Sequence, residues 1–153
     1  MTETVQRVLG WREWLALPDL GIASIKAKID TGARTSCLHA FYVDPFRRAG
    51  SAWVRFGVHP VQRDDDEVLH CQAQILDQRQ VTDSGGHREL RFVIETRLAL
   101  HDFDDVVELT LTNRDTMRFR MLLGRTAMSV GGFTVDPSAS YLAGRPDKKR
   151  NTS

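Results

Sequence analysis

Short segments in which apolar and polar residues alternate recur along the whole chain, and no long amphipathic helix separates them. In residues 22–30 the apolar Ile25, Ala27 and Ile29 alternate with lysines, which is the period of a half-buried β-strand. Similar segments occupy residues 53–61, 68–76, 91–100, 106–112, 117–124 and 132–137. Strands that follow one another this closely predict an all-β fold, built as a barrel or a sandwich.

Turn-forming residues separate the predicted strands. They gather at residues 18–21, 45–50, 64–66, 84–86, 101–105 and 113–115. One short helix is predicted over residues 125–130, because Gly131 and Gly132 follow it and glycine commonly ends helices.

Length and composition indicate a single globular domain. The chain has 153 residues, of which 41% are hydrophobic and 27% are charged, and these values are ordinary for one domain. We predict that the domain covers residues 1–142 and that a polar, basic and disordered tail covers residues 143–153. The acidic run at residues 62–67 is interpreted as a solvated loop rather than a metal site.

Net charge and terminal sequence limit the possible partners. The formal net charge of +1 gives no reason to expect nucleic acid or an acidic membrane surface as a partner. No apolar run approaches the roughly 18 residues needed to cross a bilayer, and the polar N-terminus lacks the layout of a secretion signal. We therefore expect a cytoplasmic protein in which Cys37 and Cys71 are reduced, buried thiols rather than a disulfide.

Asp30 follows the first alternating segment and precedes Thr31 and Gly32. An Asp-Thr/Ser-Gly tripeptide arises by chance in roughly one chain of this length in ten to twenty. Two interpretations therefore remain open: an Asx-type turn, in which the carboxylate bonds its own backbone, or a catalytic acid. Gly32 is expected to permit a turn that other residues resist, and the small Ala33 allows close approach of the backbone.

A second motif favours the catalytic interpretation of the Asp-Thr-Gly tripeptide. Leu122, Leu123, Gly124 and Arg125 precede the predicted short helix, and together with the earlier Asp-Thr-Gly-Ala they resemble the retropepsin-like aspartic peptidases. In that family the Asp-Thr-Gly loop carries the catalytic acid, and a later hydrophobic–hydrophobic–Gly–Arg segment passes through the loop.

The resemblance implies roles for both motifs. Asp30, Thr31 and Gly32 would be catalytic, and residues 122–125 would support their loop. It also implies a retropepsin-like peptidase domain whose fold is a closed six- to eight-stranded barrel of the acid-protease type, with one short helix near the C-terminus.

The family also has a glycine-bearing hairpin, the flap, that closes over bound peptide. Residues 82–90 (Thr-Asp-Ser-Gly-Gly-His-Arg-Glu-Leu) are the candidate, although the same residues suit an ordinary hairpin tip. The substrate-binding residues implied in this way are Ala33, Arg34, Ser84, Gly85 and Gly86.

Motifs along most of the chain narrow the resemblance. Residues 25–40, 53–60, 81–90, 111–125 and 135–142 together resemble one bacterial family often named "ATP-dependent zinc protease". That family is associated with ATP-dependent glutamate ligases that add glutamates to a ribosomal protein. The resemblance therefore implies an ATP-grasp glutamate ligase as a partner.

The residues themselves give little support to zinc or ATP chemistry. The chain has no His-Glu-x-x-His metallopeptidase motif and no Gly-x-x-x-x-Gly-Lys loop. Cys37 with His39, and His70 with Cys71, leave a Cys/His site open, but neighbours such as His70 and Cys71 point to opposite faces of a strand. We predict no metal and no cofactor, and any ATP dependence would come from a partner.

A single aspartate is insufficient for this chemistry. An ordinary aspartate has a pKa near 3.9 and is ionised at neutral pH, whereas aspartic peptidases hold two carboxylates about 3 Å apart so that they share one proton. The chain has one Asp-Thr-Gly, so Asp30 would have to meet Asp30 of a second copy in a homodimer. Thr31 would orient the loop through its hydroxyl, and Gly32 would let the two loops touch.

The sequence departs from the retroviral pattern after the Asp-Thr-Gly-Ala loop. Acidic residues that pair with the arginine of the Gly-Arg segment are replaced by Arg34 and Thr35. Arg125 then needs another acid, or the site differs in detail. The candidate acids are Glu13, Glu89 and Asp115.

The same departure suggests a substrate. Arg34, Arg88 and Arg91 would favour carboxylate-bearing peptides, unless they lie on solvated faces. The predicted function is an aspartic peptidase that hydrolyses acidic or polyglutamate-bearing peptides with water activated by two Asp30 carboxylates. The alternative is a non-catalytic module that binds acidic peptides or regulates a glutamate ligase, and a metallopeptidase is a third hypothesis.

Overall fold

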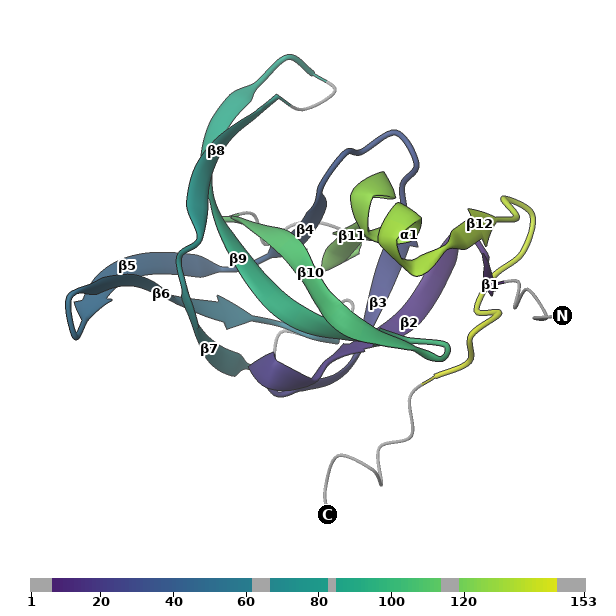
Figure 1. Ribbon diagram of the computed structural model, residues 1–153, viewed down its shortest axis with the longest axis horizontal. Helices are drawn as coiled ribbons and strands as arrows, with labels where there is room; N and C mark the ends of the chain where they lie inside the picture. The colour runs from purple at the N-terminus through teal and green to yellow at the C-terminus, as the bar shows by residue number, and fades with distance from the viewer. Residues whose placement is uncertain (1–6, 62–66, 83–84, 114–118, 146–153) are drawn as a thin grey trace, which may run out of the picture.

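The described part of the computed structural model comprises residues 7–61, 67–82, 85–113 and 119–145. It contains three β-sheets and one short α-helix (Figure 1). In chain order the elements are β1 (Arg7–Leu9), β2 (Arg12–Leu17), the 3-10 turn η1 (Pro18–Leu20), β3 (Ile22–Ile29), β4 (Ser36–His39), β5 (Tyr42–Arg48), β6 (Ser51–Val58), β7 (Leu69–Gln74), β8 (Asp77–Thr82), β9 (Arg88–Leu100), β10 (Phe103–Thr112), β11 (Met121–Leu123), α1 (Arg125–Gly131) and β12 (Phe133–Val135).

The largest sheet bends into a ring. Its order is β10-β4-β11-β3-β2-β9-β8, and β10 also pairs with β9, so the pairings return to their starting strand. The link between β2 and β9 is one residue pair, Ala16 with Ala99. The all-β prediction is therefore confirmed with a ring-like sheet, while the closed barrel stays a prediction.

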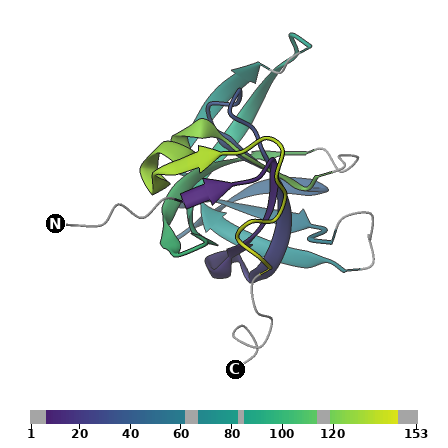
Figure 2. The ribbon, with the colours of Figure 1, turned by 90° about the vertical axis from the view of Figure 1, so that its right-hand side faces the viewer.

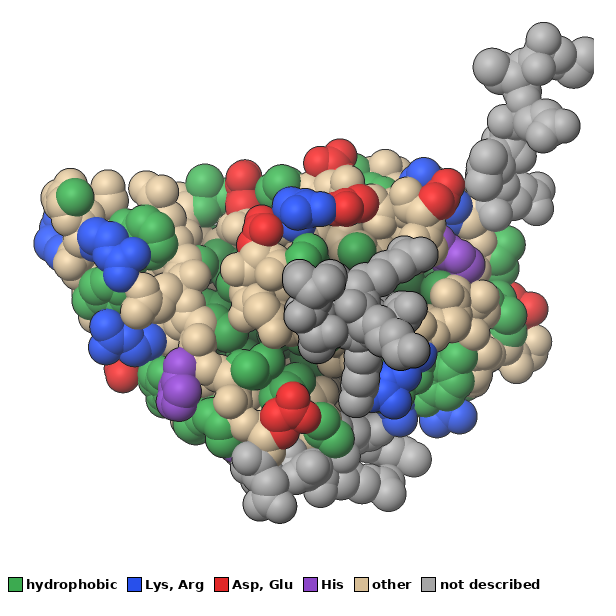
Figure 3. Space-filling view, turned by 90° about the horizontal axis from the view of Figure 1, so that it is seen from below, with side chains coloured by type: hydrophobic (Ala, Val, Ile, Leu, Met, Phe, Trp, Pro, Cys, Tyr) green, Lys and Arg blue, Asp and Glu red, His purple; other side chains and the backbone are tan. Residues whose placement is uncertain are grey.

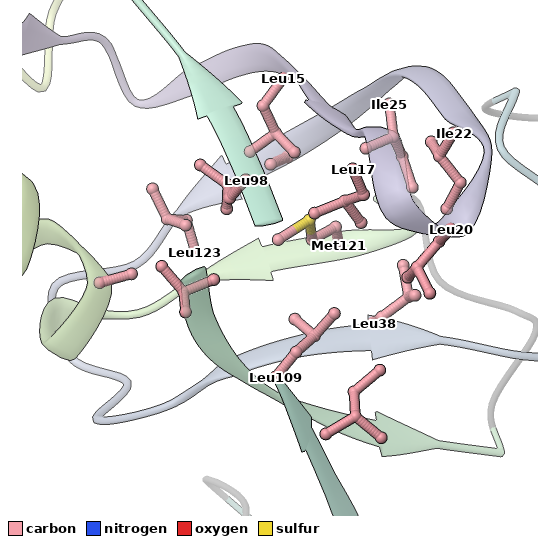
Figure 4. Packing of buried hydrophobic residues seen from close by; sticks show 14 of the residues in the cluster. Leu15, Leu17, Leu20, Ile22, Ile25, Leu38, Leu98, Leu109, Met121 and Leu123 are labelled. Atoms are coloured by element: carbon pink, nitrogen blue, oxygen red, sulfur yellow. The ribbon is translucent and has the colours of Figure 1, made fainter. Parts of the chain in front are cut away.

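The interior of the ring holds the hydrophobic core. Leu38, Leu98 and Leu109 from three strands surround Met121 and Leu123 of β11 (Figure 4). All five are at most 2% exposed, and each such side chain contributes roughly 1.5–3 kcal/mol of transfer free energy. The alternation seen in the sequence thus becomes the inward face of each strand, and β11 lies in the ring between β4 and β3.

The predicted turn at residues 45–50 is wrong in its first half. Pro45 lies inside β5 and is paired with Val54 of β6. β5 is an edge strand of the three-stranded sheet β5-β6-β7, where a residue without a backbone N–H is tolerated. The turn itself is made by Ala49 and Gly50, whose φ angles of 50° and 81° are left-handed.

The β5–β6 hairpin forms an arm that projects from the body of the molecule (Figure 1). Arg48 packs over the rings of Phe46 and Trp53, at 5.5 and 4.6 Å from their centroids. Lys and Arg side chains are visible at this end of the molecule in the view from below (Figure 3). These arginine–aromatic contacts help to order the outer end of the hairpin, whereas Val54, Phe56 and Val58 of β6 are buried in the core.

The C-terminal segment is tied to the body through a buried carboxylate. Glu13 of β2 is 0% exposed, and it accepts hydrogen bonds from the backbone N–H groups of Gly10, Leu142 and Ala143 at 2.7, 2.9 and 3.0 Å. Arg145 lies over the Trp14 ring at 4.4 Å. Residues 143–145 of the predicted tail are therefore held against β2, and residues 146–153 lie outside the described residues.

The two ends of the described chain also meet in a small parallel sheet. β1 pairs with β12 from Arg7 with Phe133 to Leu9 with Val135, and the two strands lie side by side in Figure 2. No helix within the described ranges is long and apolar enough to span a membrane.

Replacing Glu13 by alanine should destabilise the fold by about 3 kcal/mol, because three backbone N–H groups would lose their acceptor. Urea denaturation of both proteins measures the difference in free energy of unfolding. The matched control is Glu95→Ala on the exposed side of β9, where Glu95 lies opposite Glu108 and removing one like charge should cost nothing. Equal losses for the two variants would contradict the proposed clamp.

Candidate active site

Asp30 lies directly after β3, at the start of the loop that leads to β4. Its backbone N–H donates to Leu123 O at 2.9 Å, and its own carbonyl accepts from the Ala33 N–H at 3.2 Å. One carboxylate oxygen, Oδ1, accepts from the Gly32 N–H at 3.0 Å. The Asx-type bond considered for this loop is therefore present, and it occupies one oxygen of the carboxylate.

Gly124 passes through this loop. β11 pairs with β3 in parallel and with β4 in antiparallel fashion, which places Leu122 and Leu123 between the two strands that the loop joins. The N–H of Gly124 donates to Ser36 Oγ at 2.9 Å. A Cβ on Gly124 would lie 2.7 Å from the carbonyl carbon of Thr35 and 3.0 Å from Ala33 O, so only glycine fits.

The first turn of α1 completes the support of the loop. The Arg125 N–H donates to Ala33 O at 2.8 Å. The Arg34 carbonyl accepts from the Thr126 N–H at 3.1 Å and from its hydroxyl at 2.5 Å. The motifs around Asp30 and Gly124, far apart in sequence, are thus joined by hydrogen bonds along the whole loop.

The side chain of Arg125 has a backbone acceptor. Its Nη1 donates to Gly32 O at 3.2 Å. Glu13 caps the C-terminal segment, and Glu89 is bonded to Arg91 and Thr112, so neither takes the place of the missing acid. Asp115 lies outside the described residues.

Gly32 lies against the carboxylate of Asp30. Its φ is not in the left-handed region, and a Cβ there would meet Asp30 Oδ1 at 3.2 Å. The expectation of a backbone conformation that other residues resist is therefore wrong, and a larger residue here would require the carboxylate to move by a few tenths of an ångström. Thr31 and Gly32 are exposed, while Asp30 and Ala33 are partly buried.

A cleft of about 870 Å³ lies between this loop and the β8–β9 hairpin. The hairpin rises on the same side of the molecule as the loop (Figures 1 and 2). The residues that line the cleft from the loop include Asp30, Gly32, Ala33 and Arg34, and Gly85 lines it from the hairpin. Gly86 has a left-handed φ of 82° in the hairpin turn, and Ser84 lies outside the described residues.

The cleft has an excess of positive charge. Asp30 is the one carboxylate among its described lining residues, and four arginines accompany it: Arg34, Arg79, Arg91 and Arg125. Arg91 pairs with Glu89 at 3.1 Å and Arg79 with Glu108 at 3.1 Å. Within the described ranges, no ion pair neutralises Arg34 or Arg125, so the field at Asp30 favours anionic groups.

Sequence reasoning missed part of this lining. Arg79 comes from β8, whose residues show no apolar alternation and gave no sign of a strand. Cys37, His39 and Thr110 also line the cleft. Arg88, which was expected near the flap, is exposed and is not among the lining residues.

The cysteines and histidines considered for a metal site do not come together. Both cysteines are free and buried, and burial raises the pKa of the Cys71 thiol to about 11. His70 Nδ1 lies 2.8 Å from the Tyr42 hydroxyl. In the part of the chain that the structure describes, no three His, Cys, Asp or Glu residues gather where they could hold a metal ion.

A ring-like β-sheet, an Asp-Thr-Gly loop and a Leu-Leu-Gly segment threaded through that loop define the retropepsin-like class. A family model described as "Retropepsin-like aspartic endopeptidase RimB" matches residues 8–146. The chain therefore belongs to the RimB-like family, which confirms the family expected from the motifs.

Relatives among curated proteins carry another name. The chain is 46% identical over 138 residues to a probable alpha-L-glutamate ligase of Shewanella halifaxensis (strain HAW-EB4), a match that covers 90% of this chain and 30% of the relative. It is 43% identical over 147 residues to a probable alpha-L-glutamate ligase of Desulfotalea psychrophila (strain LSv54 / DSM 12343), covering 96% and 32%. The chain thus spans about a third of the length of these relatives.

A solved structure shares the fold. A protein with unknown function from Legionella pneumophila subsp. pneumophila str. Philadelphia 1 matches 91% of this chain and 99% of its own, with a TM-score of 0.76 and 24% identity. At this level of identity the comparison shows the fold alone.

Replacing Gly124 by alanine should displace the loop at residues 30–35, because the new methyl group meets backbone atoms on both sides. We expect a loss of roughly 1–3 kcal/mol in stability and shifted backbone amide resonances for residues 30–35 in NMR spectra.

Gly21→Ala is the control for this test. Gly21 has a left-handed φ of 76° and open space around it, so alanine there introduces strain of about 1–2 kcal/mol without touching the loop. Gly21→Ala should leave the resonances of residues 30–35 at their native positions. If Gly124→Ala also left them there, the threading of Gly124 would not fix the loop.

Proposed function

We propose that this chain is an aspartic peptidase in which two copies each contribute Asp30 to one catalytic pair. The observation that carries the proposal is the threading of Gly124 through the Asp30 loop at the edge of a cleft. Asp30 is the one carboxylate among the described residues that line the cleft, so a single copy provides half of the acid pair that this chemistry needs. The closed barrel implied by the family is part of the same proposal.

The pair would act through one shared proton. Two carboxylates about 3 Å apart cannot both ionise, so the pair holds a single proton at neutral pH. The ionised carboxylate takes a proton from the attacking water while the protonated carboxyl donates its proton to the peptide carbonyl oxygen, which gives a tetrahedral intermediate. The carboxyl that took the proton from water then protonates the amide nitrogen, the C–N bond breaks, and a hydroxyl of the intermediate returns its proton to the other carboxylate as the new carboxyl group forms. In each copy the Gly32 N–H bond to Oδ1 and the loop supports around it would hold the carboxylate in place.

The exposed tip of the loop supports contact between two copies. Thr31 and Gly32 are exposed, and within the described residues the Thr31 side chain forms no hydrogen bond in its own chain. Its hydroxyl is therefore available to the loop of a second copy. Gly32 carries no side chain that would keep two loops apart.

The charge of the cleft supports an acidic substrate. Arg34 and Arg125 have no carboxylate partner among the described residues, and both line the cleft with Asp30. A peptide with several glutamate side chains would place carboxylates near these guanidinium groups, where forked hydrogen bonds form. We therefore propose acidic peptides, including polyglutamate, as the substrate class.

Replacing Asp30 by asparagine should lower kcat/KM on a fluorogenic polyglutamate peptide by roughly 10²–10⁴-fold, because the acid pair is lost. The thermal unfolding midpoint should remain that of the native protein, since the side chain keeps its size and its Oδ1 acceptor. Asp44→Asn on the exposed arm is the control and should retain activity.

A mixture distinguishes a pair from a lone acid. Excess Asp30→Asn protein should inhibit the native protein by forming mixed dimers, whereas excess Asp44→Asn protein should not. Unaffected native activity, or a strictly monomeric active species in sedimentation equilibrium, would overturn the shared pair.

Reversing the charge of Arg34 should separate acidic from neutral substrates. Arg34→Glu is expected to lower kcat/KM for glutamate-rich peptides by at least about tenfold relative to neutral peptides, because one favourable contact to a carboxylate becomes a repulsion. Arg47→Glu, on the exposed arm, should leave the ratio unchanged. An equal fall for acidic and neutral peptides would contradict recognition of charge by Arg34.

A second candidate function rests on the named relatives. They are called probable alpha-L-glutamate ligases, and the chain covers about a third of each. The alternative is therefore a non-catalytic module that binds acidic peptides or regulates a glutamate ligase. Under this alternative Asp30→Asn would leave the binding of a glutamate peptide, and of the ligase, intact while no variant hydrolyses peptide bonds.

A further inference from the structure

A second cavity, of about 530 Å³, shares lining residues with the cleft and therefore adjoins it. Arg34, Thr35 and Arg79 line both cavities. The carbonyl of Arg34 is held to α1 by the two bonds from Thr126. The two cavities therefore adjoin at residues that include Arg34, whose backbone α1 fixes.

The floor of the second cavity is apolar. It is formed by Val106 and Val107 of β10 and by Ala127 and Val130 of α1. Val106 and Val130 are 46% and 62% exposed, which leaves aliphatic surface facing water inside a cavity. Covering such surface with an aliphatic side chain removes it from water, which is favourable.

The charges of the second cavity differ from those of the cleft. Two arginines, Arg34 and Arg79, are balanced by two carboxylates, Glu95 and Glu108. Glu95 and Glu108 are directly opposite each other on β9 and β10, and a like-charged pair in this position repels further negative charge. Arg79 pairs with Glu108 at 3.1 Å, so Glu95 has no ion-pair partner among the described residues.

We propose that the second cavity is a distal subsite that takes an aliphatic side chain of the same peptide whose acidic part lies in the arginine-lined cleft. This inference rests on the proposed function and extends it. The molecule would select the junction between an acidic run and an aliphatic segment. A uniformly acidic chain would meet Glu95 and Glu108 once it passes Arg34.

The test compares three peptides of equal length: all glutamate, or glutamate with an aliphatic block at either the N-terminal or the C-terminal end. We expect one of the two block peptides to be cleaved with a kcat/KM roughly tenfold above that of the all-glutamate peptide, as one aliphatic side chain in a pocket provides. Val130→Glu should bring this ratio close to one. Glu95→Gln should also lower it, by improving cleavage of the all-glutamate peptide.

Val68→Glu is the matched control. Val68 is 40% exposed and lies ahead of β7, outside the lining of both cavities. The control should keep the preference of the native protein. Equal cleavage of all three peptides by the native protein, or a preference that survives in Val130→Glu, would overturn the distal subsite.

Binding separates this inference from the proposed chemistry. Fluorescence anisotropy with the Asp30→Asn protein measures peptide affinity in the absence of hydrolysis. Tighter binding of a block peptide than of the all-glutamate peptide, with the difference lost when Val130→Glu is added, supports the subsite. This holds even if the native protein cleaves no peptide, and in that case the peptidase proposal alone fails. Binding of the three peptides with equal affinity, or of none, would reject the subsite.

Discussion

The contact between Gly124 and the loop at residues 30–36 is the constraint on which the rest of the site depends. The backbone of the loop closes around a position where even a methyl group would meet carbonyl atoms at 2.7–3.0 Å. The hydrogen bonds made by Ser36, Arg125 and Thr126 follow from this threading, since each joins the loop to residues next to Gly124. The position of Asp30 is therefore set by strands in the core rather than by the loop alone.

The electrostatics of the site depend on one residue of the same loop. The carbonyl of Arg34 accepts a hydrogen bond from Thr126 of α1, and Arg34 lines both cavities. Arg125 bonds the Gly32 carbonyl instead of a carboxylate. The backbone support of the loop therefore does not depend on the charge of the Arg34 side chain, so the scaffold and the charge of the cleft are set by different groups.

The elements that could be predicted from the sequence are those whose structure is determined by residues close to them in the chain. Strands β3, β6, β7, β9 and β10 follow from alternation, and α1 ends at Gly131, directly before Gly132 with its left-handed φ of 67°. β5 was missed because Pro45 reads as a turn, although an edge strand accepts it. β8 was missed because it is polar on both faces. The contribution of Arg79 and the distal cavity could therefore not be predicted, because the cavity combines β8 with residues of β9, β10 and α1.

The bonds that shape the Asp30 loop join residues 88 to 93 positions apart. A nascent chain that has emerged only as far as β10 has both strands flanking the loop but lacks the segment that fills it. Closing so long a stretch of chain is entropically costly and comes late in folding. The site would therefore form only when synthesis of the domain is nearly finished. An incompletely synthesised chain would have no formed cleft.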